Sequence, residues 1–151
     1  MDTKYICYCG LYCENCAVKS KIMPAGKKLL EELKKAGFEE IINYIPGGKE
    51  FWSFLIPITD GNFCISCHEG GGNPACAVRK CAQEKSLDFC ALCESYPCEK
   101  MEKFFPNYPM LKNDNDFLRE KGLQEWAKLQ DERRVRGYAY SDEIGMSSNK
   151  T

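Results

Sequence analysis

The chain of 151 residues lacks the features that would place it in a membrane, an export route or a complex with nucleic acid. No apolar run approaches the roughly 18–20 residues that a membrane helix needs. The N-terminal segment, from Met1 to Cys7, lacks the charged and then apolar layout of a signal peptide. Basic and acidic side chains number 21 and 22, so no net field attracts nucleic acid or anionic membrane. These absences predict a cytoplasmic protein.

The motifs of common enzyme classes are missing as well. There is no nucleophile elbow and no Rossmann fingerprint, and the glycine run Gly70 to Gly72 is not followed by the Lys-Ser or Lys-Thr of a phosphate-binding loop. The sequence has a single histidine, His68, whereas a catalytic zinc site usually includes histidine or carboxylate ligands and an open position. We therefore predict no catalytic residue, and we expect a binding protein rather than an enzyme.

Cysteine, in contrast, is abundant, with 11 residues in three groups. Each group contains the C-x2-C spacing that lets two thiolates from one turn reach a single metal ion. Because thiols stay reduced in the cytoplasm and their number is odd, metal ligation is favoured over disulfides and redox-active thiols. The groups are Cys7, Cys9, Cys13 and Cys16; then Cys64, Cys67, Cys76 and Cys81; then Cys90, Cys93 and Cys98.

The second group can complete a metal site by itself, because its four thiolates suit a closed structural zinc. The third group is one sulfur short. Its missing ligand comes either from the N-terminal group or, if that group forms its own site, from Cys76, Cys81 or His68. A residue next to a C-x2-C pair more often hydrogen-bonds a metal ligand or faces solvent than binds the metal itself. We therefore expect His68 not to bind the ion.

Several motifs together resemble a family of small cysteine-rich proteins from bacteria and archaea, the domain of unknown function numbered three-seven-nine-five. The resemblance covers nearly the whole chain and is carried by Cys9-Gly-Leu-Tyr-Cys13, Cys76-Ala-Val-Arg-Lys-Cys81, Tyr96-Pro-Cys98-Glu-Lys and Lys121-Gly-Leu-Gln-Glu-Trp126. It implies a zinc-binding protein without an assigned reaction. Cys7 lies outside the pattern and is expected to be an unliganded thiol. The ligands that the resemblance implies are Cys9, Cys13, Cys16, Cys64, Cys67, Cys76, Cys81, Cys90, Cys93 and Cys98.

Two other functions are compatible with this cysteine content. An iron–sulfur cluster for electron transfer or redox sensing also uses thiolates, although the cysteine run of bacterial ferredoxins is absent. A zinc-ribbon-like nucleic-acid binder is the second alternative, because Arg133, Arg134 and Arg136 form a basic cluster, although acidic neighbours dilute its field. The leading hypothesis is structural zinc that stabilises an interaction or regulatory module. Its partner is unknown, with another protein favoured over nucleic acid or membrane.

The apolar pattern outside the cysteine groups is helical. Leu29, Leu30 and Leu33 repeat at helical spacing, and a helix over 114–136 is expected in one or two pieces around Gly122. We expect the helices of residues 24–59 and 114–136 to supply the apolar core. A metal lobe over about 5–20 and 60–100 would pack against them. The predicted fold class is a helix-rich α+β domain that spans residues 1–151, with an irregular lobe stabilised by metal.

Overall fold

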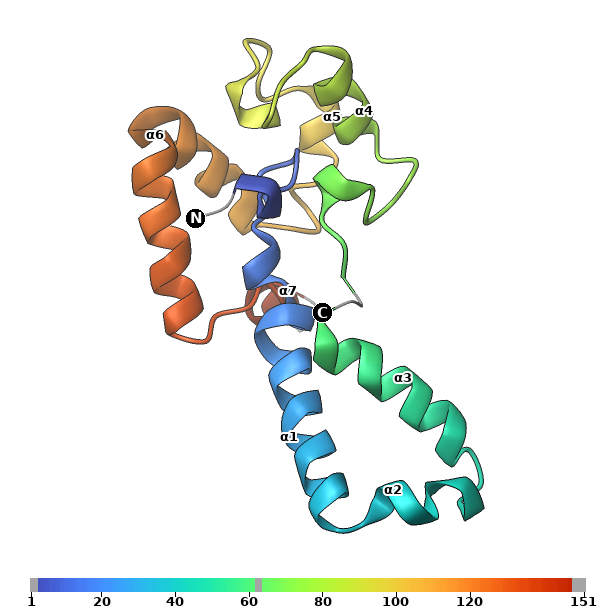
Figure 1. Ribbon diagram of the computed structural model, residues 1–151. Coiled ribbons are helices and arrows are strands. Elements are labelled where there is room, and N and C mark those ends of the chain that lie inside the picture. Colours follow the sequence, from blue (N-terminus) through green and yellow to red (C-terminus); the bar gives the residue numbers. More distant parts are fainter. Residues whose placement is uncertain (1–2, 62–63, 148–151) are drawn as a thin grey trace.

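The computed structural model describes residues 3–61 and 64–147, which form α-helices joined by loops and short helical turns (Figure 1). No strand occurs in these two ranges, where the extended pairing is limited to one isolated antiparallel bridge between Ile6 and Tyr12. The α+β prediction is therefore wrong, and the fold is all-α. The cysteine loops satisfy their backbone groups through local turns, and the apolar run from Phe51 to Ile58 lies inside a helix rather than a strand.

A helical arm, residues 23–60, extends away from the rest of the molecule (Figure 1). It consists of α1 (Met23–Lys35), α2 (Phe38–Ile41) and α3 (Gly48–Asp60). Gly37, with φ of 72°, separates α1 from α2, because a left-handed residue ends a helix. Gly26 of α1 faces Ile58 and Thr59 of α3, so the two helices meet near the base of the arm.

Residues 3–22 and 64–147 form what we term the cysteine body. It contains all the cysteines and four helices, α4 (Ala77–Glu84), α5 (Glu99–Glu102), α6 (Met110–Val135) and α7 (Ser141–Ser147). The helix predicted over 114–136 is confirmed as part of α6, which is divided by a non-helical backbone at Gly122. In the body, as in the arm, no described helix is long and apolar enough to cross a bilayer.

The apolar core lies in the cysteine body. One cluster surrounds the fully buried Met101, and the other surrounds Trp126, whose ring meets Tyr12 edge-on at 6.1 Å between centroids. Both clusters are built from the cysteine loops and from α4, α5 and α6. The prediction that the helices of 24–59 and 114–136 supply the core is therefore wrong for residues 24–59. The physical reason is that the loops carry their own apolar side chains, namely Ile6, Tyr12, Phe89, Ala91, Tyr96 and the buried cysteines.

A chain of buried polar side chains joins α6 to the N-terminal cysteine loop. Asn15 donates to Gln130 at 2.8 Å, Gln130 donates to Asp114 at 3.1 Å, and Arg133 pairs with the same carboxylate at 2.5 Å. The Tyr140 hydroxyl accepts a hydrogen bond from the backbone N–H of Tyr12 at 2.7 Å. These bonds fix the N-terminal loop, and therefore its cysteines, against the C-terminal helices.

Candidate metal centre

The N-terminal cysteines lie on a tight loop. The N–H of Cys7 bonds the carbonyl of Leu11 at 2.7 Å, and the N–H of Gly10 bonds the carbonyl of Cys7 at 2.8 Å. Gly10 has φ of 96°, and a Cβ there would lie 1.9 Å from the Asn115 side chain, so only glycine fits. Asn115 in turn donates to the carbonyl of Cys9 at 2.9 Å. The loop directs several thiols toward the second cysteine group.

The thiol of Cys7 is the centre of a first sulfur group, which consists of Cys7, Cys9, Cys13 and Cys67. Its Sγ lies 3.7 Å from that of Cys13. Contacts with Cys13, Cys67 and Cys9 raise the pKa of Cys7 far above its ordinary value. The contact with Cys7 lowers the pKa of Cys9 and Cys13, and it lowers that of Cys67 to about 6. The opposite shifts have one cause, the hydrogen bonding of the Cys7 thiol to the other three sulfurs.

A cavity of about 330 Å³ opens beside the first sulfur group. Its lining includes Cys76 at the start of α4 and the glycine-rich loop that follows Cys67. Cys64 is not among the residues that line this cavity. Burial, followed by the charges of Cys16 and Cys13, raises its pKa. The lining residues are Cys7, Cys9, Cys67, Gly71, Gly72, Asn73, Cys76, Arg79, Phe104 and Tyr108.

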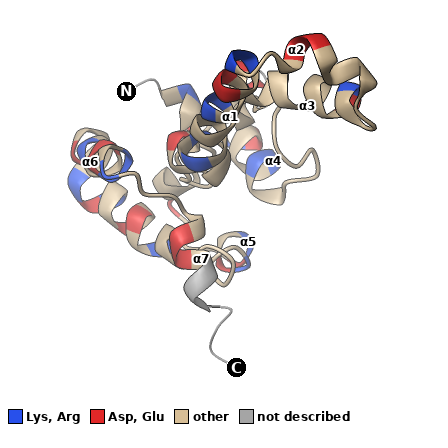
Figure 2. Ribbon diagram, turned by 90° about the horizontal axis from the view of Figure 1, so that it is seen from below, with Lys and Arg blue, Asp and Glu red and all other residues tan. Residues whose placement is uncertain are grey.

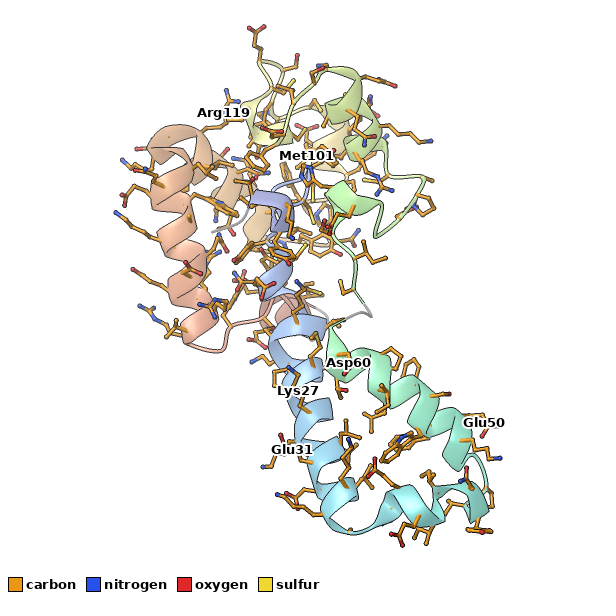
Figure 3. All side chains as sticks on the ribbon, in the orientation of Figure 1. Lys27, Glu31, Glu50, Asp60, Met101 and Arg119 are labelled. Atoms are coloured by element: carbon orange, nitrogen blue, oxygen red, sulfur yellow. The ribbon has the colours of Figure 1, made fainter. Side chains whose placement is uncertain are left out.

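A second sulfur group, Cys81, Cys90, Cys93 and Cys98, lies where α4 and α5 meet the third cysteine loop. Burial, followed by the charges of Cys98, Cys93 and Cys81, raises the pKa of Cys90 to about 12. Lys85 at the end of α4 lies 3.3 Å from the Cys93 sulfur, and the backbone of Ser95 is the main cause that lowers the pKa of Cys93. The loop of Cys90 to Cys93 is also contacted by Arg119 of α6, which Figure 3 labels in the body together with Met101.

The structure distributes the predicted ligands differently from their order in the chain. Cys67 and Cys76 lie near the N-terminal cysteines, whereas Cys81 lies with the third group. The grouping of Cys64, Cys67, Cys76 and Cys81 on one ion stays a prediction. Cys7 was expected to be an unliganded thiol outside the family pattern, yet its thiol is the centre of the first sulfur group. The glycine at position 10 is the local sequence signal for this arrangement, because it allows the turn between Cys7 and Leu11.

His68 is engaged by groups other than the sulfurs. Its ring stacks on Tyr8 with centroids 4.0 Å apart, and its Nε2 lies 2.9 Å from the carbonyl oxygen of Ile6. Among the described residues, no three side chains of histidine, cysteine, aspartate or glutamate converge as the ligands of a bound ion do. The sulfurs are therefore gathered in the structure without forming a finished coordination shell.

Acidic and basic residues are mixed along the longer helices of the described ranges. Figure 2 shows both signs interspersed along α1 and α6. Each arginine of the basic cluster has an acidic partner, with Arg133 on Asp114, Arg134 on Asp131 and Arg136 on Glu132. This local pairing leaves little free charge for a phosphate backbone.

Comparison with known proteins identifies a family. Residues 5–103 match the family described as "Protein of unknown function (DUF3795)". The match includes every cysteine and ends before α6, whose Asn115 and Arg119 contact the cysteine loops. No curated protein and no solved structure gives a significant match. Because the family model spans more than half of the chain, the protein belongs to this family of unknown function, as the cysteine motifs predicted.

Proposed function

We propose that the protein is a metal-binding module in which cysteine thiolates hold structural zinc and thereby stabilise a surface for interaction or regulation. The observation that supports this most directly is the first sulfur group. Cys67 meets Cys7, Cys9 and Cys13 across more than fifty residues of chain. An ion bound there would connect two distant loops, as structural zinc does in domains with small cores.

The distance between one pair of sulfurs favours zinc over an iron–sulfur cluster. Tetrahedral Zn–S bonds of about 2.3 Å place two sulfurs about 3.8 Å apart, and the Cys7 and Cys13 sulfurs are 3.7 Å apart. Ligands of an iron–sulfur cluster bind different irons and therefore lie farther from one another. The iron–sulfur protein remains the alternative function, and metal analysis separates the two.

A structural role is favoured over catalysis because the non-sulfur donors nearby are already engaged. His68 contacts the Ile6 carbonyl, Glu69 accepts from Ser66 at 2.8 Å, and Glu14 pairs with Lys19 at 2.6 Å. Thiolates alone then complete the shell, which is the pattern of closed structural sites. The adjacent cavity leaves space beside the sulfurs of Cys7, Cys9, Cys67 and Cys76.

The test is metal analysis of the full chain purified without oxygen. Colourless protein with stoichiometric zinc supports the proposal. Stoichiometric iron with a brown absorption near about 400 nm establishes the iron–sulfur alternative. A folded protein that carries neither metal and gains no stability from added zinc overturns metal binding altogether. Cys7→Ser is expected to lower the zinc content, and unchanged zinc in that variant would exclude Cys7 as a ligand.

A further inference from the structure

In each cysteine group, one cysteine carbonyl accepts a hydrogen bond from a side chain of α4 or α6. Asn115 donates to the carbonyl of Cys9, Arg79 to that of Cys67 at 3.3 Å, and Arg119 to that of Cys93 at 2.9 Å. A hydrogen bond to the carbonyl of a cysteine restrains the backbone from which its thiol projects. These three side chains therefore help to hold the loops that carry the sulfurs.

Arg79 differs from the other two in the number of its contacts. It is 8% exposed and lies on α4 between Cys76 and Cys81. Besides Cys67, it donates to the carbonyl of Gly71 at 2.7 Å and to that of Asn73 at 2.5 Å. One guanidinium thus bonds the start, the middle and the end of the loop that carries Cys67. The planar, fixed donors of arginine suit this task, whereas the single ammonium of lysine does not.

The charge of Arg79 has no carboxylate partner among the described residues, where its hydrogen bonds all go to neutral carbonyls. A buried guanidinium without a counter-ion is costly, so buried charges are normally paired. Arg79 lines the same cavity as the sulfurs of Cys7, Cys9, Cys67 and Cys76. The negative charge that this arginine lacks is therefore available from thiolates, and four of them on one divalent ion leave a net charge of about −2.

We infer that Arg79 is the positioning and charge-compensating residue of the first sulfur group. It holds the Cys67 loop through three carbonyls and offsets the excess negative charge of the thiolate–metal centre. This inference rests on the proposed metal binding and names the residue on which that binding depends. Arg119 offers a matched control, because it also donates to two carbonyls of a cysteine loop, but it is exposed and belongs to the second sulfur group.

The experiment compares wild type, Arg79→Gln, Arg79→Lys and Arg119→Gln as full chains loaded with zinc. Transfer of zinc to a chromophoric chelator gives the affinity of each bound ion. Second-shell changes typically cost about 10–100-fold in metal affinity, so Arg79→Gln is expected to weaken one ion by that factor. Arg79→Lys keeps the charge and should recover part of the loss. Arg119→Gln should leave the affinity of that ion within about threefold of wild type, a difference of less than 1 kcal/mol.

Each outcome decides the matter. Wild-type zinc affinity in Arg79→Gln overturns the inference while leaving the proposed function intact. Equal loss in Arg79→Gln and Arg79→Lys would make Arg79 a purely structural residue, and equal loss of the same ion in Arg119→Gln would show a general effect on the body. Wild type without bound metal overturns both proposals. If Arg79→Gln does not fold, Arg79→Lys carries the test, because full loss of affinity despite a retained charge contradicts compensation.

Discussion

The arm and the cysteine body differ most in what they bury. Among the described residues, the body holds both apolar clusters, whereas the arm contributes Ile42, Leu55 and Ile58 as its buried hydrophobic residues. The arm also exposes large apolar side chains along its length, including Leu29, Tyr44 and Phe54. α1 has no buried residue at all. Figure 3 marks the two regions, with Lys27, Glu31, Glu50 and Asp60 along the arm and Met101 and Arg119 in the body.

The region with the more regular helices is therefore not the region with the larger buried core. The arm is regular, but its helices depend on contacts with each other. The body is irregular, yet it holds Trp126, Met101 and Ile6 completely away from solvent. Irregular loops with that much burial need cross-links or a dense polar network, because their backbone has little periodic hydrogen bonding. The sulfur groups and the Asn15–Gln130–Asp114 chain supply such links.

Removal of metal is expected to have the largest effect, and to act on the body. Structural zinc contributes roughly 10–16 kcal/mol in small peptides, so a chelator should unfold the cysteine loops. The chain has two tryptophans, Trp52 in the arm and Trp126 in the body, which report on the regions separately. We expect the emission of Trp126 to shift to the red on chelation and to recover when zinc is restored.

The variant Trp52→Phe isolates the Trp126 signal, and subtraction from wild type gives that of Trp52. The comparison fails if chelation changes only the Trp52 emission, because the metal would then support the arm. Emission unchanged at both positions would show that the core around Trp126 stands without metal.

Truncation of one leucine in each region gives the next largest contrast. Leu118 of α6 is 2% exposed, so Leu118→Ala should lower the free energy of unfolding by about 2–5 kcal/mol through lost burial and a cavity. Leu29 of α1 is 46% exposed, so Leu29→Ala should stay within about 0.5 kcal/mol. Urea melts of both variants measure the difference. Equal losses would mean that the arm is as well packed as the body.

Local patterns in the sequence predicted the helices well and the fold class badly. The helical spacing of Leu123, Trp126 and Ala127 predicted much of α6, and Gly122 predicted its interruption, because both signals act within a few residues. The run from Phe51 to Ile58 is rich in β-favouring residues, so it leaves helix and strand undecided. Packing of Leu55 and Ile58 against α1 decides for the helix, and that contact is tertiary.

The same limit applies to the sulfur groups. The C-x2-C spacing shows that two thiols share a turn, but it cannot show which turns meet in space. Cys7 was expected to be unliganded because it lies outside the family motif, although its thiol contacts that of Cys67, sixty residues away. Arg79 was missed for a similar reason. Its partners are backbone carbonyls, which leave no mark on the amino-acid sequence.

Removing one ion pair in each region is expected to have a smaller effect, and the loss of stability should again be larger in the body than in the arm. Asp114→Asn removes the buried partner of Arg133 and should cost about 1–3 kcal/mol of unfolding free energy. Glu32→Gln breaks the exposed pair with Lys35 in the arm and should cost less than about 1 kcal/mol. Thermal melts at low and high salt test this, because screening weakens only the exposed pair. A strong salt effect on the Asp114 pair would contradict its burial.

The smallest effect is expected at Tyr44 near the far end of the arm, which is 86% exposed. Tyr44→Ser should change the free energy of unfolding by less than about 0.5 kcal/mol, since little buried area is lost. Tyr96→Ser in the body, where the ring is buried, is the matched control and should cost about 3 kcal/mol or more. Melts at two protein concentrations distinguish the causes. A loss at Tyr44 that grows with concentration would mean that the arm is covered by a second copy of the chain, so its exposed face would be an interface and not an unpacked surface.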